Sequence, residues 1–269
     1  GISQDMSKQE QETHMQNLGT LEGKVIVITG AGQGIGRALA GMITDLGGTV
    51  VAVDLNGEAL EALKADIPTA EIFTGDVSDA AFAASTVAAV RDKGLRLTGL
   101  VNNAGIIRPA MLLKMEESQW DDVIRVHLKG AYLWTQAVGK AMIADAGESK
   151  KTSGALVHVS SIAGRSGSIG QVNYAAAKAG IFGISMTAAK EWARYGIRSN
   201  TVSFGVVETP MTEVVRSEKF REDILSRIAL GYWAEPLEVV RPVAFLLSDS
   251  ASYITGQNLG IDGGMNINI

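Results

Sequence analysis

The chain has 269 residues, of which 46% are hydrophobic and 20% are charged, and this composition predicts a globular protein with a large core. A net charge of −5 without basic runs argues against a nucleic-acid-binding protein. The absence of cysteine excludes disulfides, thiolate metal sites and a cysteine nucleophile, and three scattered histidines do not predict a metal site.

The first twenty residues form a polar segment without the apolar core of a signal peptide. We expect a loosely packed tail over 1–20, in which His14 is solvated, followed by one domain over 21–269. No run approaches the ~18 consecutive apolar residues that a membrane span needs, so the expected location is the cytoplasm.

Short β-rich runs alternate with longer helical patterns from Lys24 onward. Runs such as VIVIT and ALVHVS are apolar almost throughout, as in strands buried on both faces of a parallel sheet. Strands are predicted over 25–29, 49–54, 71–74, 100–102, 155–160, 198–203 and 258–261. The segments between them show helical spacing, for example 37–46, 80–93, 120–144 and 174–195. This alternation predicts an α/β fold with a doubly wound parallel sheet (Rossmann-type) in a single domain.

Two segments interrupt the alternation. Residues 145–154 (DAGESKKTSG) form a polar loop, in which Lys150 and Lys151 are expected to be solvated. Residues 206–232 follow a predicted strand and mix apolar with charged side chains, as a lid over a substrate would. Because loops on a rigid scaffold carry specificity, the second segment is the predicted substrate element.

A glycine-rich run follows the first predicted strand directly and opens a helix. Such glycines allow a sharp turn, a close approach of the backbone to a pyrophosphate and tight packing of helix on strand. The helix N-terminus then offers free N–H groups to the phosphates. The predicted dinucleotide-binding residues of this run are Gly30, Gln33, Gly34, Ile35 and Gly36.

Asp54 ends the second strand, where a carboxylate can accept hydrogen bonds from both hydroxyls of the adenine ribose. The same charge repels the extra phosphate of NADP, and no nearby Arg or Lys offsets it, so NAD(H) is favoured over NADP(H). The alternative is a carboxylate that caps a turn or helix before Gly57.

Two further strand ends carry candidate cofactor contacts. Asp76 and Val77 close the third strand, where the carboxylate either holds the adenine amino group or caps the next helix. The small residues Asn103, Ala104 and Gly105 close the fourth strand and predict a wall against the cofactor, although NNAG also suits a plain turn.

Tyr174 and Lys178 stand four residues apart in a predicted helix, so their side chains share one face. A phenol of pKa near 10 is a poor acid–base catalyst, but a neighbouring ammonium and an oxidised nicotinamide lower its pKa. Ser161 follows the fifth strand, and its hydroxyl is placed to hold a substrate oxygen. A tyrosine and a lysine at this spacing are common on helix surfaces. They indicate a catalytic site only together with Ser161 and a dinucleotide site in the same sheet.

Four stretches resemble the short-chain dehydrogenase/reductase family: TGAGQGIG (29–36), NNAG (102–105), SSIAGRSGSIGQVNYAAAK (160–178) and YITGQNLGIDGG (253–264). The resemblance spans roughly 21–264. It implies a hydride-transferring enzyme in which Tyr174 is the general acid/base, Ser161 binds the substrate oxygen and Lys178 holds the nicotinamide ribose and lowers the tyrosine pKa. It also implies that Val207 and Thr209 meet the nicotinamide carboxamide, and that the chain forms a homotetramer.

Two positions depart from the family pattern. His127 stands where members usually have an asparagine that holds a water in a proton relay, and a neutral imidazole could bridge that water or accept its proton. The alternative is a ring that only packs, bonded to a backbone carbonyl. Phe204 stands where members have proline, so the loop after it loses a fixed φ angle. His158 lies inside a predicted strand and is expected to be a hydrogen-bonded core residue.

The stretch GQVNYAAAKAG and the C-terminal motif are most similar to the 3-oxoacyl-thioester (β-ketoacyl) reductases of the family. Members that use an acyl-carrier protein have an arginine where this chain has Tyr195, with Arg194 beside it, and many prefer NADPH. The substrate therefore stays open between an acyl thioester, a hydroxysteroid, a sugar or polyol and a cyclic alcohol. The rival class is a non-catalytic dinucleotide sensor, and the presence of Ser161, Tyr174 and Lys178 argues against it. A sugar-nucleotide epimerase ranks below both, because such enzymes carry a larger C-terminal substrate domain than the residues after Lys178 can form.

Overall fold

The computed structural model describes residues 19–146 and 153–267. The predicted polar tail up to residue 18, with His14, and the lysine pair of the 145–154 loop lie outside the described residues. Among the residues it describes, no helix is both long and apolar enough to cross a membrane.

Seven parallel strands form one sheet in the order β3-β2-β1-β4-β5-β6-β7. The strands are β1 (Val25–Thr29), β2 (Thr49–Asp54), β3 (Glu71–Thr74), β4 (Gly99–Asn102), β5 (Gly154–Ser161), β6 (Ile197–Phe204) and β7 (Asn258–Ile261). All seven predicted strands are confirmed, with ends that differ by at most one residue. The order reverses between β1 and β4, and such a switch point opens a crevice at the carboxyl ends of the strands.

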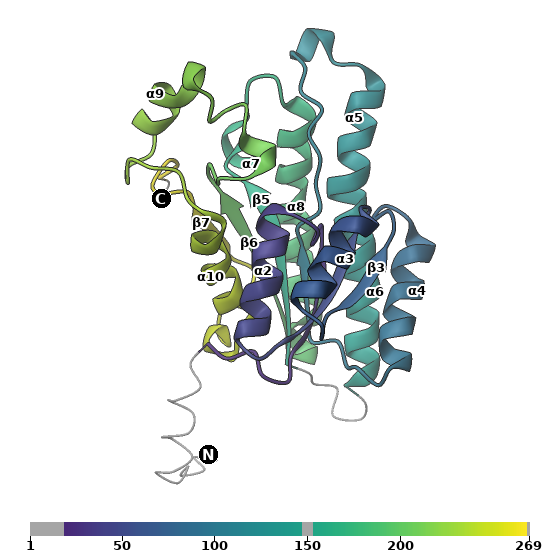
Figure 1. Ribbon diagram of the computed structural model, residues 1–269. Coiled ribbons are helices and arrows are strands. Elements are labelled where there is room, and N and C mark those ends of the chain that lie inside the picture. The colour runs from purple at the N-terminus through teal and green to yellow at the C-terminus, as the bar shows by residue number, and fades with distance from the viewer. Residues whose placement is uncertain (1–18, 147–152, 268–269) are drawn as a thin grey trace, which may run out of the picture.

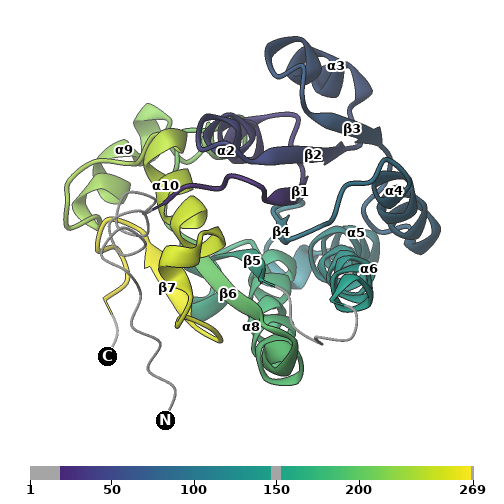
Figure 2. The ribbon, with the colours of Figure 1, turned by 90° about the horizontal axis from the view of Figure 1, so that it is seen from below.

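Helices cover both faces of the sheet, as seen along the strands in Figure 2. One face packs on α2 (Gly34–Asp45), α3 (Gly57–Asp66) and α10 (Pro236–Leu247), and the other on α4 (Ala80–Asp92), α6 (Gly130–Asp145) and α8 (Val172–Trp192). Successive residues of β2 face opposite layers: Val50 and Ala52 join the first core, Val51 and Val53 the second. The doubly wound fold in a single domain is thereby confirmed.

The helix predicted over 120–144 is interrupted. It consists of α5 (Glu117–Ile124), a π-helical turn at Arg125–Lys129 and α6, which run on in one direction (Figure 1). In the π-helical turn the Gly130 N–H bonds back to the Arg125 carbonyl, one residue farther than in an α-helix. The sequence pattern missed this change because every residue of the turn also suits an α-helix.

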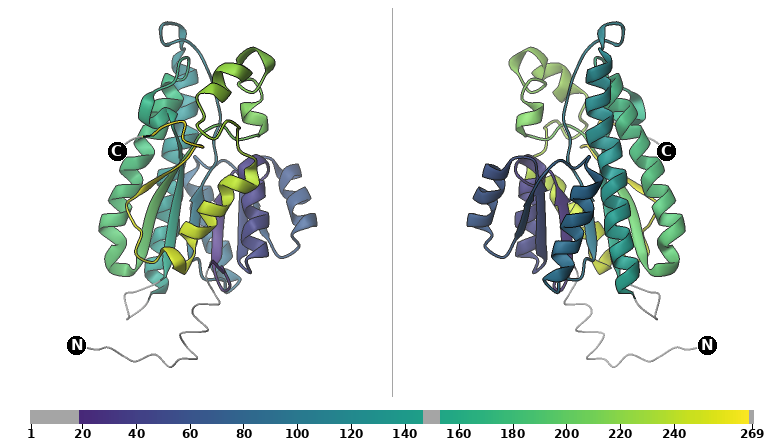
Figure 3. Two further views of the ribbon diagram at one scale, coloured as in Figure 1. Left: turned by 90° about the vertical axis from the view of Figure 1, so that its left-hand side faces the viewer. Right: turned by 90° about the vertical axis from the view of Figure 1, so that its right-hand side faces the viewer.

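The segment after β6 contains a short 3₁₀ turn, Pro210–Thr212, and the helix α9 (Glu218–Ser226). Figure 3 shows α9 standing beyond the carboxyl ends of the strands, at the end of the sheet where the crevice opens. The short helix α7 (Ala163–Ser166) follows β5 at the same end. The predicted lid segment therefore lies at the carboxyl edge of the sheet, the edge at which the crevice opens.

Candidate active site

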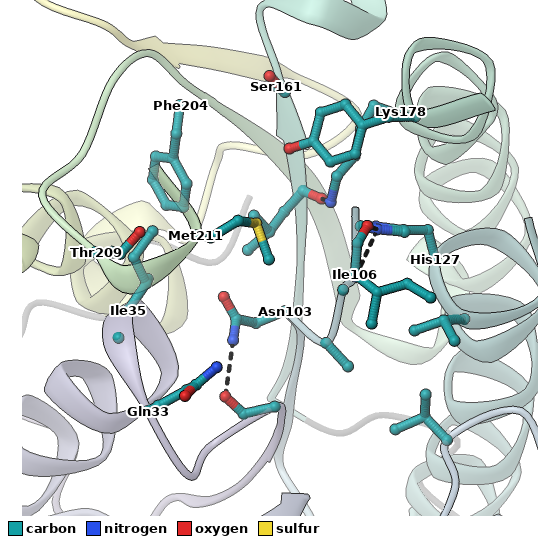
Figure 4. A pocket seen from close by; sticks show the side chains of 18 of the residues that line it. Gln33, Ile35, Asn103, Ile106, His127, Ser161, Lys178, Phe204, Thr209 and Met211 are labelled. Carbon is teal, nitrogen blue, oxygen red and sulfur yellow. Dashed lines mark hydrogen bonds between the residues drawn. The ribbon is translucent and has the colours of Figure 1, made fainter. Parts of the chain in front are cut away.

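A cavity of about 410 Å³ lies at the carboxyl ends of the strands, within the size range of small-molecule sites (Figure 4). The predicted cofactor and catalytic residues line it, Gly36 excepted: Gly30, Gln33, Gly34, Ile35, Asp54, Asp76, Val77, Asn103, Ala104, Gly105, His127, Ser161, Tyr174, Lys178, Val207 and Thr209. The fold thus brings together residues from distant parts of the chain at one place.

The glycine loop joins β1 to α2 with two residues in left-handed conformations, Gly30 (φ +67°) and Gly34 (φ +54°). A Cβ at Gly36 would overlap the carbonyl oxygen of Gly30, so only glycine lets the helix start so close to the loop. The N-cap residue of α2, Gln33, accepts no side-chain hydrogen bond from the first turn. The loop therefore leaves a narrow cradle at a helix N-terminus, which fits a pyrophosphate.

Asn103 fastens the end of β4 to this loop. Its side-chain amide donates to the carbonyls of Thr29 (3.1 Å) and Gly30 (3.2 Å), while the Thr29 hydroxyl accepts from the backbone of Asn103 and Ala104. Residues 103–105 of the NNAG stretch thus line the cavity and form no turn.

Asp54 ends β2 at the edge of the cradle. One carboxylate oxygen accepts from the Gly32 N–H at 2.9 Å and the other from the Asn56 N–H at 2.9 Å. The cap of the following helix is Asn56, which accepts from Ala59, so the helix-cap alternative for Asp54 is wrong, whereas the bond from the Asn56 N–H is the predicted turn. A carboxylate held in this way fits a ribose at the end of the glycine loop.

Asp76 lines the cavity but does not cap the next helix. The N-cap of α4 is Asp79, and the Asp76 carboxylate accepts from Ser78 and, at 2.6 Å, from Arg125. Partial desolvation is the largest single effect and raises the Asp76 pKa, but the hydrogen bonds from Ser78 and Arg125 and the charge of Arg125 together outweigh it, so the pKa is lowered. Asp76 therefore reaches the cavity as part of an ion-pair network that includes Arg125, and a contact of its carboxylate with the adenine amino group stays a prediction.

Ser161, Tyr174 and Lys178 meet where β5 ends against α8. Lys178 is buried and donates to the Val159 carbonyl at 2.7 Å, and its nitrogen lies 5.6 Å from the centre of the Tyr174 ring. Burial lowers the Lys178 pKa to about 7. Desolvation raises the Tyr174 pKa, opposed by a hydrogen bond with Ser161. In the protein without cofactor the Tyr174 pKa is raised, so Tyr174 is a neutral phenol, and the lowering expected from the ammonium does not appear.

Comparison with known proteins gives the family. A family model described as enoyl-(acyl carrier protein) reductase matches residues 30–266. The 3-oxoacyl-(acyl-carrier-protein) reductase FabG of Thermotoga maritima is 46% identical over 254 residues, covering 92% of this chain and 99% of the relative. The chain belongs to the short-chain dehydrogenase/reductase family.

Other relatives span related activities. The (3R)-3-hydroxyacyl-CoA dehydrogenase of Rattus norvegicus is 38% identical over 257 residues, covering 91% of this chain and 97% of the relative. A solved structure from Beutenbergia cavernae, described as an NAD(P)-dependent gluconate 5-dehydrogenase with bound NADP at low occupancy, superposes with a TM-score of 0.85. It is 34% identical and covers 92% of this chain and 98% of that one. The chain is therefore an oxidoreductase with a fold that binds a nicotinamide dinucleotide.

His127 is the first departure of this short-chain dehydrogenase/reductase from the family pattern. It lies in the π-helical turn, with Nε2 2.7 Å from the Ile106 carbonyl oxygen and 3.0 Å from the Ile106 nitrogen. Burial, assisted by the charge of Lys178, lowers its pKa to about 3, so it is neutral and does not accept a proton at neutral pH. A Cβ at Gly105 would overlap the ring, so the glycine of NNAG makes room for it.

Phe204, the second departure, is buried and lines the cavity (Figure 4). The chain after it is held without proline: Gly205 donates to Ile261, and Val207 pairs with Ala234 in a β-bridge. Backbone hydrogen bonds therefore fix the conformation of this loop. The presence of Phe204 in place of the family's proline did not by itself predict them.

His158 is a core residue, as predicted. It is fully buried, with one ring nitrogen 3.1 Å from the Asn102 amide and the other 3.0 Å from the Ser199 hydroxyl. Burial lowers its pKa to about 4. Among the described residues, no cluster of three or more His, Cys, Asp or Glu side chains could hold a metal ion.

Several cavity residues were not anticipated from the sequence. They are Ile106 and Arg108 after NNAG and Arg125 in the π-helical turn, whereas Met211 and Thr212 lie within the predicted substrate element 206–232. Ile106 and Arg108 could have been predicted as cavity residues from their position shortly after a strand end, because loops at the carboxyl edge of such sheets line the ligand site. Arg125 carried no such signal, because its partner Asp76 lies far away in the sequence.

Proposed function

We propose that this oxidoreductase interconverts a 3-oxoacyl thioester and its 3-hydroxy form with NAD(H), using Tyr174 as general acid and base. The observation that supports this best is the convergence of Ser161, Tyr174 and Lys178 in the same cavity as the glycine loop. A carbonyl held there would lie between a proton donor and a cofactor seated on the loop.

Tyr174 gives its proton to the substrate oxygen during reduction and takes it back during oxidation, while Ser161 holds that oxygen by its hydroxyl. The neutral phenol of the free protein suits the donor role. After donation the phenolate is stabilised by the charged form of Lys178, whose pKa of about 7 lets it bind or release a proton near neutral pH. A substrate oxygen, a tyrosine and a lysine thus form one proton path.

When bound, the nicotinamide ring supplies or accepts the hydride. The residues that would hold the dinucleotide are the glycine loop for the pyrophosphate, Asp54 for the adenine ribose, and Val207 with Thr209 for the carboxamide. The Asp54 charge and its fixed orientation support NAD(H) over NADP(H). The Beutenbergia cavernae structure is described with bound NADP, so the preference of this chain for NADH over NADPH is to be measured directly.

His127 takes part in the proton path as a neutral bridge. Its contact with the Ile106 carbonyl suits a proton on Nε2, which leaves Nδ1 as an acceptor, and Nδ1 has no hydrogen-bond partner among the described residues. A second cavity of about 10 Å³, lined by His127 and Lys178, has room for about one water. A water there would connect the Lys178 amine to Nδ1.

The rim of the main cavity supports a thioester substrate. Arg108 lines the cavity with a half-exposed side chain, where a phosphate of a CoA or phosphopantetheine thioester would meet a cation. Met211, Val214 and Val215 expose apolar side chains on the lid segment, next to where an acyl chain would leave the cavity. Arg194 precedes β6 at the amino end of the sheet and stacks on Tyr195, so within one subunit it is remote from the cavity.

A homotetramer is part of the proposal. The long helices expose large apolar side chains, Trp120 on α5, Tyr132 on α6 and Met186 on α8, which a subunit interface would bury. Light scattering coupled to size exclusion tests the state of assembly directly.

The test of the function is the initial rate of acetoacetyl-CoA reduction with NADH and with NADPH, for the wild type and Tyr174→Phe. We expect turnover favouring NADH and a loss of about 10²- to 10⁴-fold in the variant, with NADH binding retained. Turnover with NADPH alone would overturn the proposed preference for NAD(H). An active Tyr174→Phe variant would overturn the proposed role of Tyr174 as general acid and base. Absence of thioester turnover would redirect the search to polyols, hydroxysteroids and cyclic alcohols with NAD.

A further inference from the structure

Asn173 stands directly before Tyr174 and is completely buried. Both N–H groups of its side-chain amide are used: Nδ2 donates to the carbonyls of Arg108 (3.0 Å) and Gln119 (2.9 Å). Its Oδ1 accepts from the backbone N–H of Tyr174 at 2.7 Å. The amide therefore connects three parts of the chain that are distant in sequence.

The position of Asn173 in its helix shows that it is not an ordinary cap. The N-cap of α8 is Gln171, and Asn173 is already inside the first turn. A capping side chain accepts from N–H groups two or three residues ahead, whereas this one mainly donates outward to α5 and to the segment after NNAG. Its hydrogen bonds serve contacts between elements.

The segment 106–110 forms one wall of the cavity, to which Ile106 and Arg108 contribute. Its backbone is held at three places: Ile106 by the His127 ring, the Arg108 carbonyl by Asn173, and the Ala110 N–H by the Gly170 carbonyl at 2.9 Å. All three contacts engage backbone atoms, so they fix where the wall lies whatever side chains it presents.

We propose that Asn173 is a positioning residue that sets the substrate-side wall 106–110 at a fixed place relative to Tyr174. It acts through Tyr174 and the wall and touches neither substrate nor cofactor. The inference rests on the proposed role of Tyr174, because only then does the spacing of wall and tyrosine govern the alignment of the substrate carbonyl with its proton donor. The cofactor cradle lies on other elements and is independent of Asn173.

The variant Asn173→Asp separates the contact with the Tyr174 N–H from the contacts with the carbonyls of Arg108 and Gln119. The carboxyl keeps an acceptor for the Tyr174 N–H but, ionised or protonated, donates to at most one of the two carbonyls. Asn200→Asp is the matched control, because Asn200 is also buried, donates to a carbonyl (Ile254, 2.9 Å) and accepts a backbone N–H (Gln257, 3.1 Å) between β6 and β7.

In steady-state assays of the full-length protein with acetoacetyl-CoA, we expect Asn173→Asp to lower kcat/KM by about 10- to 100-fold, mainly through a higher KM for the thioester. The dissociation constant of NADH, followed by its fluorescence, stays at the wild-type value. Asn200→Asp leaves the KM for the thioester unchanged. Equal kinetic effects of the two variants, or an unchanged KM in Asn173→Asp, would overturn the proposal.

Hydrogen–deuterium exchange gives a readout that needs no substrate. We expect Asn173→Asp to speed exchange in 106–110, including the Ala110 N–H, and to leave the glycine loop 30–36 as protected as in the wild type. Unchanged exchange in 106–110 would refute the coupling. The proposed function fails separately, through full activity of Tyr174→Phe, and the exchange result still decides whether Asn173 holds the wall.

Discussion

The side-chain nitrogen of Lys178 lies 5.6 Å from the centre of the Tyr174 ring, close enough for the charge of one to act on the ionisation of the other. No carboxylate forms an ion pair with Lys178 in the part of the chain that the structure describes. The protein without cofactor therefore buries an amine whose charge is poorly compensated, and this costs stability for the sake of the proton path.

Lys178→Met should stabilise the cofactor-free protein while abolishing turnover. Burial lowers the lysine pKa from 10.5 to about 7, so below pH 7 the amine is charged in both the folded and unfolded states and the folded state bears the full cost. We expect a stability gain on the order of a few kcal/mol at pH 6 that shrinks as the pH rises from 7 toward 10.5. Thermal unfolding across this range measures it, and a gain independent of pH would contradict the burial argument.

Gly36→Ala should prevent dinucleotide binding. The new methyl group would overlap the Gly30 carbonyl and push the helix start away from the loop. Gly41→Ala is the control on the same helix, since nothing lies within 4 Å of its Cβ position, and we expect it to be neutral or stabilising by up to about 1 kcal/mol. Titration of NADH fluorescence distinguishes the two; wild-type affinity in Gly36→Ala would show that the cradle is not where the cofactor binds.

Asp54→Asn should weaken the preference for NADH. The amide removes the negative charge yet keeps an oxygen for the Gly32 or Asn56 N–H, so the loop stays in place while repulsion of a ribose phosphate disappears. We expect the ratio of kcat/KM for NADH over NADPH to fall by about tenfold or more, corresponding to one hydrogen bond to a charged group. An unchanged ratio would mean that specificity is set elsewhere.

Arg216→Ala should loosen the lid segment. The guanidinium bonds to the Glu208 carboxylate (3.0 Å) and the Thr209 carbonyl (3.2 Å), and it lies 6.0 Å from the centre of the Trp233 ring. We expect a several-fold higher KM for NADH and faster proteolysis within 209–226. Arg227→Ala, which breaks only an exposed pair with Asp223, is the control and should behave as the wild type.

His127→Asn should make the protein more resistant to acid. The histidine pKa falls from 6.5 to about 3 on folding, so its contribution to stability is present above pH 6.5 and is lost as the pH falls toward 3. An asparagine amide can satisfy the N–H and carbonyl of Ile106 without titrating. Relative to pH 8, we expect the variant to lose less stability at pH 4.5 than the wild type, on the order of 2 kcal/mol. Equal losses would mean that His127 does not remain neutral in the folded protein.

The strands and the cavity could be predicted from sequence because their signals are local. The buried strands are almost entirely apolar. The glycine loop and Ser161 each directly follow one predicted strand, and Tyr174 and Lys178 lie on one helix. The alternation of strands and helices predicts where these elements lie in the fold, and therefore that these residues line one cavity. Helix α10, which was not among the helical segments named from the sequence, carries Pro242 inside it, and this weakens the local helix signal. Contacts between distant segments had no local signal: Asp76 with Arg125, and Asn173 with the Arg108 carbonyl, exist only once the sheet has brought their elements together.

The π-helical turn at Arg125–Lys129 fixes the phase of two helices at once. A turn closed by an i→i+5 hydrogen bond holds one residue more than an α-helical turn, so α5 and α6 keep the phase that an unbroken helix would give them. The extra residue changes only which side chains of 125–129 face inward, and His127 reaches Ile106 while Trp134 stays in the core beside Phe82. A single-residue deletion between 125 and 129 should therefore leave Trp134 in the core and remove the contact of His127 with Ile106, so that the damage falls on the active site and not on the fold.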